Sequence, residues 1–189
     1  MRGRDKFEKY ERVIHIFSGL TRILPLKLRL FLLQLVRSWK GKIGITIRYI
    51  LLSTVAKKIG SNVVIYEDVY LYHPNNITFG NNVSIHPNSY IQASGDLSIG
   101  SDVSIAHNVT IMTETHQYSS LNSNIKDQPM DRRAIDIRDN VWIGAKSTIL
   151  LGTTILSGAI IGAHSLVNRD VEANEIVGGT PIKTLKRRG

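Results

Sequence analysis

The fold is decided by residues 137–172, which read IRDNVW IGAKST ILLGTT ILSGAI IGAHSL VNRDVE when written six at a time. Each group begins with Ile or Val, and its fifth residue is small or β-branched. A period of six fits neither an α-helix, with 3.6 residues per turn, nor a plain strand, with a period of two. It predicts a hexapeptide β-helix, an all-β fold whose short strands wind into triangular coils and bury one column of side chains per face.

The same register extends upstream of this stretch. Large apolar residues recur every six positions within 59–71, 79–91 and 99–111. Between these segments the spacing widens to eight, at 74–76 and 94–96, where turn-forming residues indicate enlarged corners. Three hexads make one turn, so we expect coils that each rise about 4.8 Å. The five expected coils are 59–76, 79–96, 99–116, 137–154 and 155–172.

The pattern divides the chain into three parts. Residues 1–58 are predicted to form a basic amphipathic helical arm, and residues 59–176 the β-helix, with an inserted loop at 113–134. Residues 177–189 are predicted to be a C-terminal basic tail. A rod with a single column of buried side chains per face has a marginal core, so we expect oligomerisation to cover one of its faces.

Charge is distributed unevenly along the chain. Residues 1–58 hold fourteen Lys and Arg against three Asp and Glu, a net charge of +11, whereas residues 59–189 hold ten against twelve, a net charge of −2. The basic residues alternate with Leu and Ile rather than with stacking aromatics, so we expect no nucleic-acid binding. The chain has no cysteine, which excludes a disulfide framework, a thiolate zinc site and a cysteine nucleophile, and agrees with a cytoplasmic protein.

The N-terminal segment contains an amphipathic helix, which Gly41 and Gly44 are expected to break, and residues 45–55 are expected to resume as a second helix or a strand. Its uncharged runs fall well short of the roughly 20 residues needed to span a bilayer, and no signal peptide is evident. Two interpretations remain open: a helical cap on one end of the rod that also contacts neighbouring subunits, or a basic anchor for peripheral contact with anionic lipid on the inner face of the membrane. The apolar positions of this helix are Leu24, Leu28, Phe31, Leu32 and Leu35.

The one long interruption of the register lies between Ile111 and Ile137, and a loop of this kind in a regular coil is usually functional. His116 opens it, in MTETHQY at 112–118, although a solvated loop histidine is the simpler alternative. The coil resumes with NVWIG at 140–144. Trp142 is too bulky for a core sized for Ile, so we expect it to face outward, either into a site or into a subunit interface.

These residues support a resemblance. Residues 99–116, residues 139–145 and the VGGTP of 177–181 together resemble the hexapeptide-repeat acetyltransferases, above all the maltose and galactoside O-acetyltransferases and the capsule and lipopolysaccharide O-acetyltransferases. The resemblance covers about residues 59–186. It implies a left-handed parallel β-helix, a homotrimer with its sites in the clefts between subunits, and acetyl-CoA as co-substrate without a metal.

The resemblance also implies roles for particular residues. His116 would be the general base, which takes the proton of an acceptor hydroxyl so that the oxygen attacks the thioester directly. Backbone amides at 144–145 are the candidates for stabilising the oxyanion. Glu114 is near enough in sequence to orient His116, with a solvated carboxylate as the alternative. The implied acetyl-CoA contacts are Ala145, Ala163, Asn168, Arg169, Lys183 and Lys186.

The acceptor side departs from the family pattern. His86 stands where the sugar acetyltransferases carry an asparagine, with Asn88 two residues further on, and both can hydrogen-bond a sugar hydroxyl. Trp142 would line the same cleft. The capping segment of the small-sugar enzymes is missing, and the basic N-terminal segment stands in its place, which favours a glycan or lipid-linked acceptor. The expected function is therefore acetyl-CoA-dependent O-acetylation of a sugar hydroxyl on a surface polysaccharide or its precursor.

Other functions remain as alternatives. An N-acyltransferase acting on an amino sugar and a serine O-acetyltransferase share the fold, although the latter enzymes carry a larger helical N-terminal domain with paired acidic residues. A γ-type carbonic anhydrase would need three zinc-bound histidines, but the histidines here fall at different phases of the hexad and no His-x4-His pair occurs. A catalytically silent scaffold and a tail that only aids solubility are the remaining alternatives.

Overall fold

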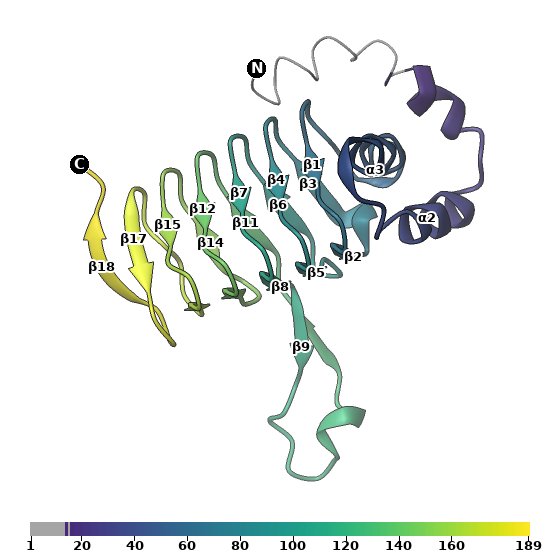
Figure 1. Ribbon diagram of the computed structural model, residues 1–189. Helices are drawn as coiled ribbons and strands as arrows, with labels where there is room; N and C mark the ends of the chain where they lie inside the picture. The colour runs from purple at the N-terminus through teal and green to yellow at the C-terminus, as the bar shows by residue number, and fades with distance from the viewer. Residues whose placement is uncertain (1–13, 15) are drawn as a thin grey trace.

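The computed structural model describes residue 14 and residues 16–189, and its body is a triangular β-solenoid of about six turns (Figure 1). Residues 1–13 and 15 of the predicted N-terminal arm lie outside the described residues. The chain winds repeatedly through three parallel sheets, which we name the first, second and third sheet in the order of winding. The all-β, parallel-coil fold class predicted from the sequence is confirmed.

The three sheets consist of very short strands, as the six-residue repeat requires. The first sheet contains β1 (Val64–Ile65), β4 (Ser84–Ile85), β7 (Ser104–Ile105), β12 (Trp142–Ile143), β15 (Ile160–Ile161), β17 (Glu175–Gly178) and β18 (Lys183–Arg187). The second contains β2 (Tyr70–Tyr72), β5 (Tyr90–Gln92), β8 (Thr110–Met112), β13 (Thr148–Ile149) and β16 (Leu166–Val167). The third contains β3 (Ile77–Phe79), β6 (Leu97–Ile99), β11 (Ile135–Ile137) and β14 (Thr154–Ile155).

The core is a set of stacked columns, one per sheet. In the first sheet Ile85 lies in register with Ile105, Ile105 with Ile143, and Ile143 with Ile161. These four side chains are fully buried or nearly so. Identical branched residues repeat at the strand spacing of about 4.8 Å, so each side chain packs directly on the ones above and below it. The stacked columns themselves make up the core of the prism.

The corners between sheets are built from residues that tolerate left-handed backbone conformation. Asn and Asp occupy most of the non-glycine positions with positive φ, because their short side chains permit it. At one corner they also form a ladder, in which the Asn62 amide donates to Asn82 at 3.1 Å and the Asn82 amide to Asp102 at 3.0 Å. Polar corners therefore link successive coils outside the core.

The sequence prediction of five coils is wrong by one turn at the C-terminal end. Val177 in β17 stacks in register on Ile161, which is 16 residues earlier, whereas Ile161 stacks on Ile143, which is 18 residues earlier. The last passage through the third sheet is thus shortened to a single bridge at Val171, and the six-residue register is lost there. The predicted C-terminal tail is folded as well, since β18 pairs antiparallel with β17.

Two helices cover the other end of the prism: α2 (Leu26–Leu35) and α3 (Gly41–Val55) (Figure 1). Gly41 begins α3 instead of breaking a helix, and Gly44 lies inside it, which corrects the sequence prediction. The reason is close packing, because a Cβ at Gly44 would lie 2.0 Å from the Trp39 carbonyl oxygen. None of the helices in the described residues has the length and hydropathy of a membrane span.

A buried arginine joins these helices to the first coil. Arg48 is only 1% exposed, and its guanidinium donates to the carbonyl oxygens of Val36, Arg37 and Trp39 at 2.7 to 3.1 Å. The same side chain donates from Nε to the Ile65 carbonyl of β1 at 2.9 Å. Burial lowers the pKa of Arg48, while Glu67 and Asp68 oppose that change. Arg48 therefore connects the turn after α2, α3 and the first strand.

The predicted apolar face of the first helix is largely exposed. Leu33 is the only residue of α2 that is buried, and Leu30 and Leu32 pack partly against the core. Leu28, Phe31 and Leu35, which belong to the predicted apolar face, are exposed. Helix α2 contacts α3, and its Gln34 donates to the Leu71 carbonyl of the first coil at 3.5 Å. The rest of its apolar surface faces outward.

The inserted loop at 113–134 is an ordered hairpin that projects from the prism (Figure 1). Its strands β9 (Glu114–His116) and β10 (Met130–Arg132) pair antiparallel. The hairpin leaves at the corner between the second and third sheets, where the two coils before it are also enlarged. Those enlargements are the short 3-10 helix η1 (Pro74–Asn76) and the corner at 93–96.

Candidate active site

His116 is the third residue of β9 and lies near the base of the hairpin, directly opposite Met130 of β10. Its side chain is exposed. Within the described part of the chain, no hydrogen bond fixes the imidazole, so both ring nitrogens are open to a ligand or to another subunit. Glu114 does not reach His116, because its carboxylate is bound by Arg132 at 2.9 Å and by Gln92.

The end of the hairpin is held by a buried amide. The Gln128 side chain is 7% exposed, donates to the Ser120 and Ser123 carbonyls at 2.9 and 3.2 Å, and accepts from the Ser120 amide at 3.1 Å. The 3-10 helix η2 (Ile125–Asp127) precedes it. The hairpin is therefore a shaped element, and it carries Leu121 at 97% exposure into solvent.

The corner between the first and second sheets forms a second feature, which we call the shelf. Successive coils place His86, Ala106, Gly144 and Gly162 here in register, since each amide donates to the residue stacked beyond it in the first sheet. The side chain at this corner position thus becomes smaller from coil to coil, from the imidazole of His86 through the methyl of Ala106 to the hydrogen of Gly144 and Gly162. A Cβ at Gly144 would lie 2.6 Å from the Ala163 nitrogen, so the coils can stack this closely only with glycine.

The predicted residues Ala145 and Ala163 both lie on this shelf, each directly after its glycine. The Gly144 amide donates to the Ile161 carbonyl at 2.8 Å, so it is committed to the coil and is not available to an oxyanion. The Ala145 amide has no acceptor among the residues that the structure describes. Of the two backbone donors expected at 144–145, one is therefore open.

His86 closes the broad end of the shelf. Its ring stacks on Tyr66, with centroids 4.7 Å apart and an angle of 18° between the planes. Burial lowers the pKa of His86, and the nearby charge of His107 lowers it further. A neutral imidazole at this place can both donate and accept a hydrogen bond. Asn88 lies on the same turn, exposed and with a φ of 61°.

Trp142 opens β12 and faces outward from the first sheet, where it is 55% exposed, as expected from its size. In register with it are Ser104 on one side and Ile160 on the other. The ring therefore lies on the flank of the prism, two residues before the small positions of the shelf.

The remaining predicted contacts fall elsewhere. Asn168 and Arg169 lie at the corner after the second sheet, on the side of the hairpin. Arg169 pairs with the buried Glu175 at 3.1 Å. Burial acts to raise the pKa of Glu175, but hydrogen bonds from Arg169, Thr184 and the Glu172 amide lower it to about 2. Arg169 thus already has a structural partner in the chain.

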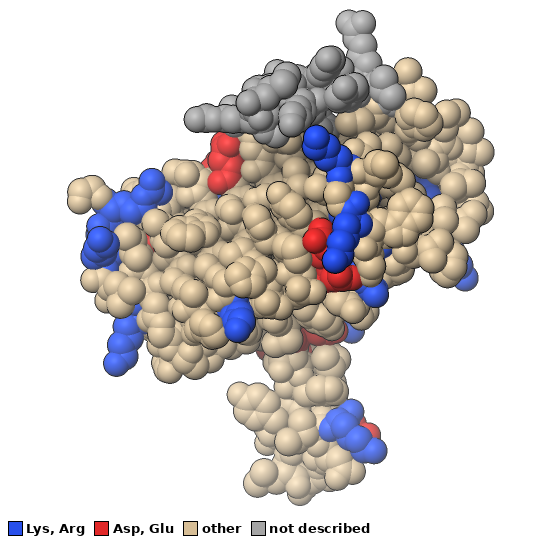
Figure 2. All heavy atoms as spheres, viewed as in Figure 1, with Lys and Arg blue, Asp and Glu red and all other residues tan. Residues whose placement is uncertain are grey.

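Lys183 and Lys186 lie on β18 and are exposed. Figure 2 shows Lys and Arg side chains gathered at the end of the prism that carries this strand. They form a basic edge at the last strand of the first sheet, with Lys183 opposite Gly178 at the shelf side of β17, while Arg187 lies opposite Glu175 at the far side. Such an edge suits phosphate groups.

The structure divides the predicted site into two halves. His86, Asn88, Ala145 and Ala163 lie at the corner where the strands of the second sheet begin, whereas His116 lies beyond the corner where these strands end. One chain therefore places the base and the shelf on opposite edges of the second sheet.

Sequence reasoning did not find Tyr66, His107 or Glu175. The first two occupy the shelf in register with residues already singled out, and the spacing of about 20 residues between coils could have revealed them. Glu175 gives no such signal, because it lies where the repeat fails. Among the described residues, no group of three or more His, Cys, Asp and Glu could hold a metal ion.

The curated proteins that resemble this chain in sequence include acetyltransferases. No family model matches the chain. A chloramphenicol acetyltransferase of Agrobacterium fabrum is 48% identical over 52 residues, covering 28% of this chain and 25% of that protein. WbbJ of Escherichia coli K12, assigned as a lipopolysaccharide biosynthesis O-acetyl transferase, is 31% identical over 81 residues, covering 43% of this chain and 41% of that protein. The chain thus spans between a quarter and two-fifths of these relatives' length.

Solved structures match more completely. The hexapeptide-repeat acetyltransferase VCA0836 of Vibrio cholerae, in complex with acetyl-CoA, superposes with a TM-score of 0.75 at 26% identity, covering 86% of each chain. Maltose and galactoside acetyltransferases are also among the structural neighbours, the latter in complex with CoA. The resemblance to hexapeptide-repeat acetyltransferases predicted from the sequence is therefore confirmed. The enzymes that the chain resembles are acetyltransferases, and CoA or acetyl-CoA is bound in two of these structures.

Proposed function

We propose that this protein is an acetyl-CoA-dependent O-acetyltransferase that modifies a sugar hydroxyl of a surface polysaccharide or its precursor. The observation that carries the proposal is the pair of half-sites: an exposed histidine on an ordered hairpin, and a shelf of Gly and Ala with a basic edge at its narrow end. Relatives with the same fold are acetyltransferases, and one is assigned to lipopolysaccharide biosynthesis.

The chain's residues fit the co-substrate by their chemistry. Acetyl-CoA supplies the acetyl group as a thioester on a long thin arm that ends in a nucleotide with several phosphates. Ala145 and Ala163 leave the shelf without bulky side chains, so an extended arm can lie against the backbone. Lys183 and Lys186 offer cations for the phosphates at the end of that path. Asn168 and Arg169 would contribute from the other corner.

His116 then performs the proton transfers. Its neutral imidazole accepts the proton of the acceptor hydroxyl while the hydroxyl oxygen forms a bond to the thioester carbonyl carbon. The Ala145 amide is positioned to donate to the oxygen on which negative charge develops. When the carbon–sulfur bond breaks, the leaving sulfur takes the proton from His116, and the histidine is restored. No protein nucleophile is needed.

The acceptor would lie between the two half-sites. His86 and Asn88 offer hydrogen bonds to sugar hydroxyls at the broad end of the shelf, and the exposed Trp142 ring offers an apolar wall on the flank. A lowered pKa keeps His86 neutral, so it can hydrogen-bond a sugar without adding charge.

We further propose a homotrimer in which the hairpin of one subunit meets the shelf of its neighbour. Two facts support it: a single chain keeps His116 and the shelf on opposite edges of the second sheet, and the hairpin carries exposed apolar residues. The exposed apolar residues of the hairpin are Tyr118, Leu121 and Ile125.

Peripheral attachment to anionic lipid on the inner face of a membrane belongs to the same proposal. Residues 14–58 contain nine Lys and Arg and no Asp or Glu. Basic charge beside exposed apolar side chains suits an anionic bilayer surface, whereas it repels a second copy of the same segment. Figure 2 shows mainly uncharged surface at the end that carries α2 and α3, with basic residues at its edge. The exposed apolar residues are Ile16, Phe17, Leu20, Ile23, Leu26, Leu28, Phe31, Leu35, Trp39 and Ile43.

The test of the activity is release of free CoA thiol from acetyl-CoA with a panel of sugars, amino sugars and extracted glycans. We expect transfer to a hydroxyl, and a loss of about 10²- to 10⁴-fold in His116→Ala, the range for removing a general base. Transfer to amino sugars alone would replace the O-acetyl proposal by N-acylation. Co-sedimentation with vesicles tests the membrane contact, and binding that does not depend on anionic lipid would contradict it.

A further inference from the structure

The hairpin that carries His116 needs external support. It consists of two strands of three residues each, and a two-stranded hairpin is at best marginally stable alone. Within it only backbone hydrogen bonds and a few side chains hold the strands together. The position of His116 relative to the prism therefore depends on what fixes the base of the hairpin.

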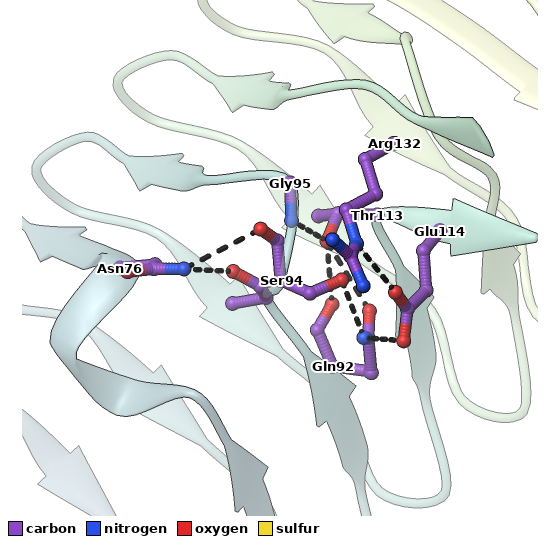
Figure 3. A network of polar contacts seen from close by, with 8 residues as sticks. Asn76, Gln92, Ser94, Gly95, Thr113, Glu114 and Arg132 are labelled. Atoms are coloured by element: carbon purple, nitrogen blue, oxygen red, sulfur yellow. Dashed lines mark hydrogen bonds and ion pairs between the residues drawn. The ribbon is translucent and has the colours of Figure 1, made fainter. Parts of the chain in front are cut away.

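The base rests on the enlarged corner at 93–96 of the preceding coil. Asn76, at the end of η1, donates to the carbonyls of Ala93 and Ser94 at 3.1 and 3.4 Å. A Cβ at Gly95 would lie 2.6 Å from the Thr113 carbonyl oxygen, so glycine lets the hairpin start directly against this corner. The two extra residues of this corner thus form a seat for the next coil (Figure 3).

Thr113, the residue from which the hairpin departs, is fully buried on that seat. Its hydroxyl accepts from the Gly95 amide at 2.8 Å and donates toward Gln92, whose carbonyl and side-chain oxygens lie 3.1 and 3.2 Å away. Its carbonyl also accepts the Arg133 amide at 3.0 Å, which closes the return strand onto the same point.

Glu114 connects this seat to both strands of the hairpin (Figure 3). Its carboxylate accepts from Gln92 of β5 and from Arg132 of β10, the latter at 2.9 Å. Hydrogen bonds from Ser94 and Arg132 hold its pKa below the usual range, so the carboxylate remains charged at neutral pH. One ionised group therefore joins the outgoing strand, the returning strand and the coil beneath.

Glu114 and His116 are two residues apart on one strand, so their side chains leave β9 on the same face, about 6.8 Å apart along it. We propose that Glu114 is a positioning residue: through Gln92, Ser94 and Arg132 it fixes the angle of the hairpin and thereby places His116 for the proton transfer. This proposal rests on the role of His116 in the proposed function. Sequence spacing alone suggested a direct contact with His116, which the geometry does not contain.

We therefore expect loss of the Glu114 contacts to affect kcat more than the KM for acetyl-CoA. Misplacing a general base by about 1 Å can cost on the order of 10²-fold in rate. Neither Glu114 nor the groups that it contacts are among the proposed acetyl-CoA contacts, so the KM for acetyl-CoA should change much less than kcat.

The test compares Glu114→Gln with Asp131→Asn in the full-length protein. Both remove one carboxylate from the hairpin base, but the one ion pair of Asp131 among the described residues is with Arg133, two positions further on, at 3.2 Å. We expect Glu114→Gln to lower kcat about 10- to 100-fold with the KM for acetyl-CoA within twofold. Amide hydrogen exchange should quicken at 114–116 and 130–132, with exchange in the coils unchanged. Asp131→Asn should match the parent protein in all three measurements.

A second arm reverses the pair, with Glu114→Arg and Arg132→Glu combined. The double variant should recover part of the activity that each single variant loses, because Gln92 can turn its amide to offer oxygen to a cation. Parent-like kcat in Glu114→Gln, an equal loss in Asp131→Asn, or a loss of kcat with unchanged hairpin exchange would each overturn the proposal. A parent protein without acetyl transfer overturns the proposed function instead, and the exchange data still decide whether Glu114 holds the hairpin.

Discussion

Isoleucine residues of the coils and of the N-terminal helical region meet opposite surroundings. Ile105 in β7 is fully buried between Ile85 and Ile143, whereas Ile23, just before α2, is 80% exposed. The coils bury apolar residues by repetition, since each coil supplies the surface that its neighbour needs. Among the described residues, the segment before α3 packs only on α3 and the first coil and has no repeated neighbour of this kind.

Apolar residues therefore serve two different purposes in this molecule. In the coils they produce stability and leave a nearly neutral outer surface, with a net charge of −2 over residues 59–189. In residues 14–58 some of them are buried, as at Leu33, Leu51 and Leu52, but ten large apolar side chains remain exposed on a segment whose charged residues are all basic. Large exposed apolar patches on a protein mark interaction sites. Substitutions in the two regions should therefore affect different measurements.

The largest effect is expected in the core of the coils. Ile105→Ala should lower the free energy of unfolding by about 2–5 kcal/mol, because the cavity is enclosed on both sides by stacked neighbours. Ile23→Ala should stay within about 0.5 kcal/mol. Urea denaturation of both variants measures the difference, and similar losses would mean that the N-terminal region is buried in solution.

The next effect should come from the residue that joins the two regions. Arg48→Met should cost about 3 kcal/mol, because the Val36, Arg37, Trp39 and Ile65 carbonyls lose a buried donor. Arg48→Lys should not restore stability, since one ammonium cannot reproduce the guanidinium geometry. Thermal unfolding checks both variants, and full rescue by lysine would contradict the assigned role.

A smaller and pH-dependent effect is expected at the last turn. Glu175→Gln should cost about 2 kcal/mol at neutral pH, because it breaks the buried contacts to Arg169 and Thr184. The pKa of Glu175 is lowered to about 2, below that of an unfolded glutamate, so its stabilisation is complete above about pH 4.3 and is lost as the pH falls towards 2. Unfolding curves from pH 7 to pH 2 should show parent and variant converging in acid.

The smallest effect on stability should accompany a clear effect on binding. Ile23→Ser combined with Phe31→Ser should change the free energy of unfolding by less than about 0.5 kcal/mol per site. The same variant should bind anionic vesicles several-fold more weakly than the parent. Leu185→Ser, at an exposed apolar residue on β18, is the matched control and should bind like the parent. Equal vesicle binding by all three proteins would remove the exposed surface from the membrane proposal.

The sequence predicts the coils well because their physics is local and repeated. Ile143, Ile149 and Ile155, which begin successive hexads and lie on the three successive sheets, show the six-residue period directly, and the size of Trp142 indicates that it faces outward. The resemblance that singled out His116 is carried by short contiguous motifs, which need no knowledge of tertiary structure.

The sequence predicts the remainder less well because those features depend on non-repeated contacts. The sixth turn escapes notice since the register slips at Val171, and the apolar periodicity of α2 does not single out Leu33 as its buried residue. Glu114 has the sequence spacing of a histidine partner, but Arg132 and Gln92 arrive from distant positions and bind it first. Periodicity cannot describe a contact between segments that share no repeat.

Both ends of the prism are closed by elements that ignore the repeat: α3 covers the first coil, and β18 runs antiparallel along the last strand of the first sheet. An open strand edge would template end-to-end growth of a fibre, so these terminators keep the molecule discrete. They also make its length an independent variable. Inserting or deleting one whole coil would leave both ends intact and change the distance from His86 to the basic edge by the rise of one coil. The number of coils therefore sets the length of an extended ligand that fits along the solenoid.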